Sequence, residues 1–158
     1  MSRKTVTTIS IILLVILVGM FWLFMESQAS IYQAEDEAVA IVEVDYPVKQ
    51  VNEFYWVTFD ETFFSLDFFD NQEVQRYAII SQEGGDTDYY TYDELISEPQ
   101  AKELTLANMG EVDIIQARLG KLANNPVWEI TLRNANGTLT YYYLNAVNGT
   151  WVQTIENI

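Results

Sequence analysis

The sequence predicts an α+β protein in which an N-terminal transmembrane helix is followed by two similar units. Each unit is expected to be a helix packed on a three-stranded antiparallel sheet. Three observations support this fold class. A long apolar run without charges lies near the N-terminus. Runs of aromatic and β-branched residues, separated by short polar joints, follow it. The order helix, strand, strand, strand then occurs twice.

The apolar run Thr5–Met25 is expected to cross a membrane as a helix. A helix of this length spans roughly 31 Å at about 1.5 Å per residue, which matches a hydrocarbon core of about 30 Å. Arg3 and Lys4 precede the run and Glu26 follows it. The positive-inside rule therefore places residues 1–4 in the cytoplasm and the remainder outside the cell. We expect a single-pass protein of the cell membrane with an extracellular C-terminal domain.

A cleaved signal peptide is the alternative interpretation. Ser27-Gln28-Ala29, followed by Ser30, fits the small-x-small cleavage pattern. The apolar stretch is longer than the roughly 7–15 residues of a typical signal core, however, and this length favours an uncleaved anchor.

Charge restricts the partners of the expected extracellular part, residues 26–158, which is called the outer part below. The chain has 23 acidic and 8 basic residues, and all the acidic ones follow Met25. With six basic residues, the outer part carries about −17 (6 − 23). Such a surface repels phosphate backbones, so no nucleic-acid partner is expected. The chain also has no cysteine, so the outer part must be held together by its core rather than by disulfides.

The first unit is predicted to begin with an amphipathic helix within Gln28–Tyr46, which Pro47 ends. This helix either continues directly from the membrane segment or follows a break near Ser27–Ser30. Three β-type runs come next: Val51–Phe59, Phe63–Phe69 and Gln75–Ser81. Gln82–Asp88 is then predicted to be a loop.

The second unit has a well-marked helix. Ser97 is a plausible N-cap, Pro99 lies in the first turn, and Gln100 completes a capping box. Gly110 is expected to end the helix. A weak apolar stripe along it consists of Ala101, Leu104, Ala107 and Asn108.

Three further strands are predicted: Val112–Leu119, Val127–Arg133 and Leu139–Leu144, with Trp151–Ile155 as a final extended piece. Asn136-Gly137 and Asn148-Gly149 predict tight turns. Phe63 corresponds to Val127 and Gln75 to Leu139, each at a spacing of 64 residues (127 − 63; 139 − 75). Alternation along the strand should direct Trp128, Ile130 and Leu132 to one face, toward the helix.

The residues offer little catalytic chemistry. Histidine and cysteine are absent, so the usual base, thiol nucleophile and transition-metal ligands are missing. The serines lack the G-x-S-x-G and S-x-x-K patterns. The pairs Asp60/Glu61 and Asp93/Glu94 resemble glycosidase carboxylates, but in so acidic a chain solvated turns explain them better. The sequence therefore predicts no enzyme and no catalytic, cofactor or metal site.

One acidic cluster and one aromatic cluster each allow more than one interpretation. Asp86, Asp88 and Asp93 have calcium-type oxygen ligands, but their spacing does not fit the EF-hand loop. Tyr89, Tyr90 and Tyr92 form an aromatic cluster between the two units. They either fill the seam between the units or form a patch for a partner protein, because tyrosine is enriched at interfaces.

The chain resembles the YpmB-like family of Gram-positive bacteria, also called TseB-like cell-wall elongation regulators. The residues that carry the resemblance are the anchor, the Ile31–Val42 helix, Asn52-Glu53-Phe54-Tyr55-Trp56, Asn125-Pro126-Val127-Trp128-Glu129-Ile130, Gly137, Tyr141-Tyr142-Tyr143, Leu144 and Gly149. One departure is Asp60-Glu61, which stands where a glycine turn would be usual.

The resemblance implies two PepSY-like repeats outside the membrane, here residues 26–92, including a helical stalk, and residues 93–158. It also implies a non-enzymatic regulator of cell-wall elongation that contacts a membrane-bound penicillin-binding protein. A small-molecule substrate is not expected. The alternative function is that of a PepSY-type inhibitor or chaperone of an extracellular peptidase.

Overall fold

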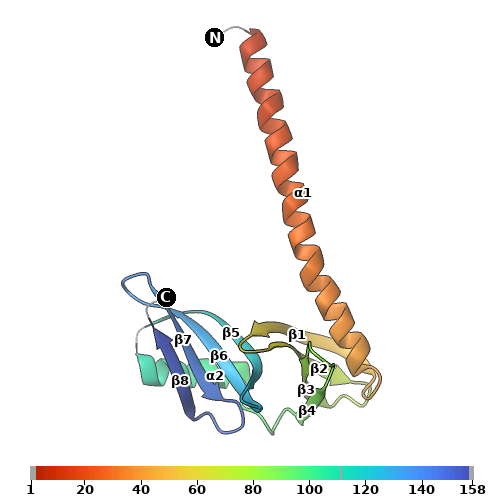
Figure 1. The fold of residues 1–158 in the computed structure, drawn as a ribbon, viewed down its shortest axis with the longest axis vertical. Coiled ribbons are helices and arrows are strands. Elements are labelled where there is room, and N and C mark those ends of the chain that lie inside the picture. The colour runs from red at the N-terminus through yellow and green to blue at the C-terminus, as the bar shows by residue number, and fades with distance from the viewer. Residues whose placement is uncertain (1–2, 111, 157–158) are drawn as a thin grey trace. The chain divides into compact units, whose positions relative to one another are not determined.

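The structure is a computed structural model that describes residues 3–110 and 112–156, and the side chains of residues 9–23, 30–110 and 112–156. It divides into two compact units, residues 1–37 and 38–158. The described elements, in chain order, are α1 (Arg3–Val42), β1 (Val48–Thr58), β2 (Thr62–Asp70), β3 (Gln75–Ser81), β4 (Thr87–Thr91), α2 (Glu98–Met109), β5 (Asp113–Leu122), β6 (Asn125–Arg133), β7 (Leu139–Asn145) and β8 (Trp151–Glu156) (Figure 1).

Helix α1 is continuous from Arg3 to Val42, so the expected membrane segment and the first outer helix form one helix without a break at residues 27–30. Its sequence contains no proline and a single glycine, Gly19, so the backbone hydrogen bonds can continue along its length. Among the residues that the structure describes, no helix qualifies by length and hydropathy as a membrane span. Part of the expected span, residues 5–8 and 24–25, has side chains outside those described.

Each sheet has four antiparallel strands rather than the three predicted. The strand orders are β1-β2-β3-β4 and β5-β6-β7-β8 (Figure 1). The additional strands are β4, which includes two of the clustered tyrosines, and β8, which was expected only as an extended piece. They also follow the internal repeat, because Thr87 and Trp151 are again 64 residues apart (151 − 87). Each additional strand lies at the outer end of its sheet and satisfies the backbone of β3 or β7.

Helix α2 confirms the predicted capping. The Ser97 side chain accepts a hydrogen bond from the Gln100 amide at 3.4 Å, and the Ser97 amide donates to Gln100 Oε1 at 2.8 Å. The predicted apolar stripe is wrong beyond Ala101, because Leu104, Ala107 and Asn108 are exposed. The second buried position is Thr105, whose hydroxyl donates to the Ala101 carbonyl at 2.8 Å and so needs no other polar partner.

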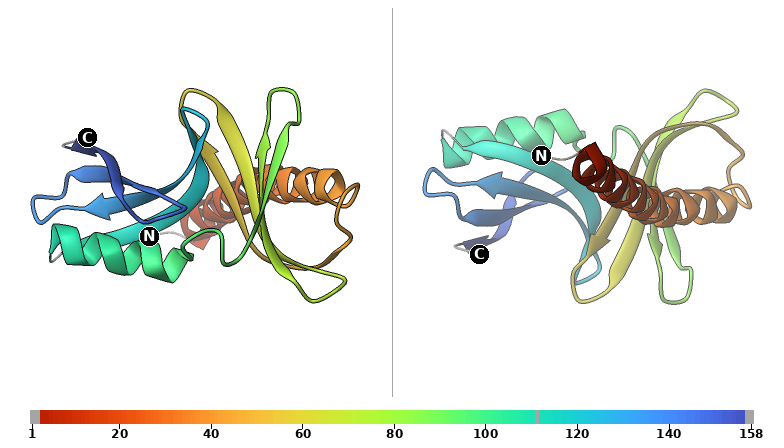
Figure 2. Two further views of the ribbon diagram at one scale, coloured as in Figure 1. Left: turned by 90° about the horizontal axis from the view of Figure 1, so that it is seen from below. Right: turned by 90° about the horizontal axis from the view of Figure 1, so that it is seen from above.

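The two sheets share one hydrophobic core. Strands β1 and β5 lie against each other between the sheets (Figure 2), and Ser65 Oγ of the first sheet donates to the Leu119 carbonyl of the second at 2.9 Å. The shared core consists of Tyr55, Val57, Phe63, Tyr77, Ile79, Leu95, Ala101, Ala117, Leu119, Trp128, Ile130, Leu132, Tyr142, Leu144 and Ala146. Residues from both repeats therefore depend on each other for burial.

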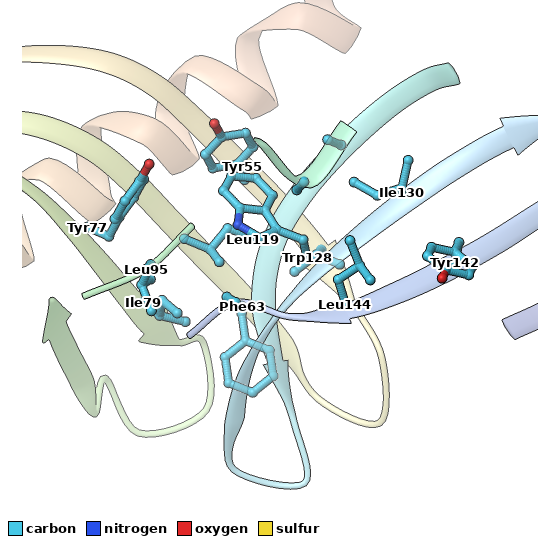
Figure 3. Close-up of a cluster of buried hydrophobic side chains, with 14 of the residues drawn as sticks. Tyr55, Phe63, Tyr77, Ile79, Leu95, Leu119, Trp128, Ile130, Tyr142 and Leu144 are labelled. Atoms are coloured by element: carbon cyan, nitrogen blue, oxygen red, sulfur yellow. The ribbon is translucent and has the colours of Figure 1, made fainter. Parts of the chain in front are cut away.

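Trp128 lies at the centre of this core (Figure 3). Its ring makes edge-to-face contacts with Tyr55 and Tyr77 of the first sheet, with centroids 5.4 and 6.4 Å away. Its indole nitrogen donates to the Ile96 carbonyl at 2.8 Å. Ile130 and Leu132 are buried in the same core, which confirms the predicted inward face of this strand. The indole thus joins β6, the first sheet and the segment before α2.

Candidate functional site

The tyrosine cluster between the repeats is largely occupied by intramolecular contacts. Tyr89 donates to Asp45 Oδ2 at 2.9 Å and packs edge-to-face on Tyr46. Tyr90 packs against the shared core. Tyr92 stacks on Tyr77, with ring centroids 5.7 Å apart, and remains 40% exposed. Neighbouring positions on a strand face opposite sides, so Tyr89 and Tyr90 do not form one surface patch.

Burial and hydrogen bonding both keep Tyr89 neutral. Burial is the larger cause, and the hydrogen bond to Asp45 is the next, and together they raise the pKa of Tyr89 far above 10. Its hydroxyl therefore acts as a hydrogen-bond donor at physiological pH, and its contact with Asp45 anchors β4 to the segment before β1.

An open cleft of about 380 Å³ lies among three hairpin tips. Its polar lining consists of Asp60, Glu61, Ser81, Glu83, Asp86, Lys121 and Asn124. The lysine in this set is already engaged, because Lys121 forms an ion pair with Asp88. The cleft is consequently acidic, and it does not suit an anionic ligand.

Some of the carboxylates that the sequence singles out are engaged by neighbouring residues. Thr91 satisfies both members of one pair, because its hydroxyl donates to Asp93 Oδ1 at 2.6 Å and its amide donates to Glu94 Oε2 at 2.6 Å. Asp88 pairs with Lys121 rather than joining Asp93. Among the described residues, no group of three or more potential ligands is placed to hold a metal ion.

A second groove, of about 410 Å³, lies on the face of the second sheet opposite the core. It contains a network that the sequence did not indicate. Arg118 Nη2 lies 2.9 Å from Glu129 Oε1, and the Tyr143 hydroxyl donates to Glu129 Oε2 at 2.8 Å. Glu129 is 4% exposed, and its charge is compensated by the arginine.

Neighbouring strands bring this network together. Arg118 of β5 is directly opposite Glu129 of β6, which in turn is opposite Tyr143 of β7. Burial, followed by the hydrogen bond to Glu129, raises the pKa of Tyr143 well above its usual range, so the hydroxyl stays a donor. A charged residue between two apolar neighbours, Trp128 and Ile130, was the available signal. Its partners depend on strand register, which the sequence pattern did not specify.

Comparison with known proteins identifies one solved structure with this architecture. The YpmB protein from Bacillus subtilis superposes with a TM-score of 0.66 at 18% sequence identity, and the match covers 77% of this chain and 95% of that one. The chain has a YpmB-like fold. No family model matches the sequence, and no curated protein does so either.

The YpmB-like fold confirms the resemblance at the level of architecture. The match covers nearly all of the YpmB chain, so the paired sheets form a shared arrangement rather than a local similarity. At this identity the likeness concerns fold, whereas function depends on surfaces whose side chains differ.

Proposed function

We propose that the chain is a membrane-anchored extracellular interaction module that regulates cell-wall elongation by contacting a membrane-bound penicillin-binding protein. The observation that carries the anchoring is the segment Ile9–Leu23, in which every large apolar side chain is 47–68% exposed. A helix that is apolar on all sides needs an apolar surrounding. The lipid bilayer supplies it, with Thr5–Met25 as the proposed span.

Interaction rather than catalysis is supported by the chemistry of the folded unit. The chain has no histidine or cysteine, and the carboxylates of Asp88, Asp93 and Glu129 are engaged in a turn or in ion pairs. The resemblance to the YpmB-like family supplies the proposed class of partner. A strongly acidic outer surface would orient such a partner and exclude others through like-charge repulsion.

The anchoring is tested by membrane fractionation of the full chain expressed in a Gram-positive host. The protein should remain in the membrane pellet after alkaline carbonate extraction. A variant with Leu14→Lys and Leu17→Lys should leave the pellet, because central lysines in a span each cost roughly 2.5–3.5 kcal/mol on insertion scales. Recovery of a chain that begins at Ser30 in the medium would instead establish signal-peptide cleavage.

The partner is tested by crosslinking the full chain in living cells and identifying the membrane proteins captured. Reproducible recovery of a penicillin-binding protein, with altered elongation when the chain is depleted, is the expected result. Recovery of an extracellular peptidase whose activity the chain suppresses would support the alternative PepSY-type function and contradict the proposal.

A further inference from the structure

Strand β8 is an outer edge of the second sheet, and it differs from the other outer edge. It pairs with β7 on one side, and no other described strand pairs with its second side (Figure 1). An edge strand presents a row of backbone N–H and C=O groups that are able to pair with another extended chain. Strands β1 and β5 are also at sheet ends, but they lie against each other.

The edge at β4 is protected, whereas the edge at β8 is not. All five residues of β4 are partly buried, Asp88 is ion-paired, and Tyr89 is hydrogen-bonded to Asp45. In β8, by contrast, Trp151 is 61% exposed and Ile155 is 44% exposed. Strand β8 contains no lysine and no proline, the residues that commonly protect edges from pairing.

The groove beside β8 provides a place for side chains of an added strand. Gln153 and Ile155 of β8 line it, so the groove on this face of the sheet extends as far as the edge strand. Its charged lining consists of Asp60 together with the paired Arg118 and Glu129, which leaves a net charge of −1 (1 − 2). Strand addition typically obtains affinity from main-chain hydrogen bonds and specificity from such pockets.

We propose that β8 accepts an extended segment of a partner protein that carries lysine or arginine, and that this segment becomes the next strand of the second sheet. This inference rests on the proposed function as an interaction module and assigns its binding surface. Charge identifies the occupant: a second copy of the chain would bring a further net charge of −15, so like-charge repulsion disfavours self-pairing and favours a cationic segment.

The test measures hydrogen exchange of the full chain in detergent micelles, with a synthetic peptide that alternates lysine and valine as the probe. The peptide should slow exchange in the segment Trp151–Glu156 and leave Thr87–Thr91 unchanged. A peptide of alternating glutamate and valine should bind at least about tenfold more weakly. A lysine peptide with N-methylated backbone amides should give no protection, because it cannot complete the ladder.

Charge variants at matched edges provide the control. Ile155→Lys should weaken binding of the lysine peptide by about tenfold, and Ile155→Glu should strengthen it. Thr87→Lys makes a positive charge on the other edge and should leave protection of β8 unchanged. The opposite responses of the two Ile155 variants separate a charge effect from simple loss of folding, which would weaken binding in both.

Several results would overturn the inference. The first is slower hydrogen exchange at β4 instead of β8, and the second is binding of the glutamate peptide as tight as that of the lysine peptide. The third is unchanged exchange at β8 when the lysine peptide is saturating. The fourth is protection of β8 without peptide that increases with protein concentration, which indicates self-pairing. If the in-cell crosslinks still recover a penicillin-binding protein in any of these cases, the interaction module stands and only the β8 assignment fails. If no partner is recovered while β8 is protected by the peptide, the proposed function fails instead.

Discussion

Asp70 shows how one buried carboxylate defines a tight turn. It ends β2, and its Oδ1 accepts hydrogen bonds from the amides of Gln72 and Val74 at 2.8 and 2.9 Å. Its Oδ2 accepts from Arg76 Nε at 2.9 Å, and the Arg76 guanidinium in turn lies over the Tyr46 ring. Burial opposes ionisation of Asp70, but the hydrogen bonds and the arginine outweigh it and lower the pKa of Asp70 below 3.8.

This lowered pKa predicts an acid-dependent contribution to stability. A depressed folded-state pKa stabilises the fold above the unfolded value, and the contribution disappears as the pH falls through the folded value. Asp70→Asn should therefore be less stable than wild type above pH 3.8, and the difference should shrink at lower pH. Urea unfolding across this range measures it, with the exposed Asp113→Asn as the control for loss of one negative charge. A difference between Asp70→Asn and wild type that is independent of pH would contradict this account.

Gly120 allows the close approach of β5 to β1. A Cβ at this position would lie 2.4 Å from Val57 Cγ1 and 3.0 Å from Phe59 Cε2, so neighbouring atoms would have to move. We expect Gly120→Ala to destabilise the fold by about 1–3 kcal/mol through overpacking, as measured by chemical denaturation. Val57→Ala creates space at the same point, so Gly120→Ala should lower the free energy of unfolding less in the Val57→Ala background than in the wild type. If the effects of the two substitutions are instead additive, the contact between positions 120 and 57 is not the cause.

At the scale of elements, the segment before α2 has two roles. Ser97 caps the helix, and the carbonyl of Ile96 accepts the hydrogen bond from the indole of Trp128. Ser97→Ala removes the acceptor for the Gln100 amide and should cost about 1 kcal/mol. Ser97→Asp retains a capping oxygen and should recover most of this stability. Thermal unfolding of the two variants measures the difference, and equal destabilisation by alanine and aspartate would show that the cap is not responsible.

The sequence predicted the elements that have strong local signals. The capping box of α2 and the glycine turns of the second sheet are local patterns, and Gly137 and Gly149 do adopt positive φ angles of 86° and 71°. Strand β4 was missed because it has only five residues and contains Asp88. Its place in the sheet comes from pairing with β3 and from contacts made by Tyr89 and Tyr90, which are tertiary interactions.

The candidate surface was less predictable for a related reason. The sequence indicated Tyr89, Tyr90 and Tyr92 from their composition, but the structure shows their intramolecular contacts. The exposed edge at β8 follows from sheet order, and the adjoining groove follows from the register of β5, β6 and β7. Strand order and register depend on contacts between distant residues, so composition alone does not specify them.

At the scale of the whole molecule, the shared core couples the two repeats. Tyr55 of β1 contacts Trp128 through its ring, and its hydroxyl donates to Glu98 Oε2 of α2 at 2.8 Å. Two independent halves would each need to bury enough apolar surface on their own, which is difficult for units of this size. A polar residue at position 128 is therefore expected to destabilise both sheets together.

Trp128→Gln tests this coupling. Loss of the central ring, with a polar amide left in its place, should cost at least about 3–5 kcal/mol, a large part of a typical stability of about 5–15 kcal/mol. Hydrogen exchange should accelerate together at Ala78–Ile80 of the first sheet and at Ile130–Leu132 of the second. The matched variant Trp56→Gln, at a position that is 37% exposed, should have a much smaller effect. If the first sheet kept its protection while the second exchanged freely, the two repeats would be separate folding units, and the shared core would not couple them.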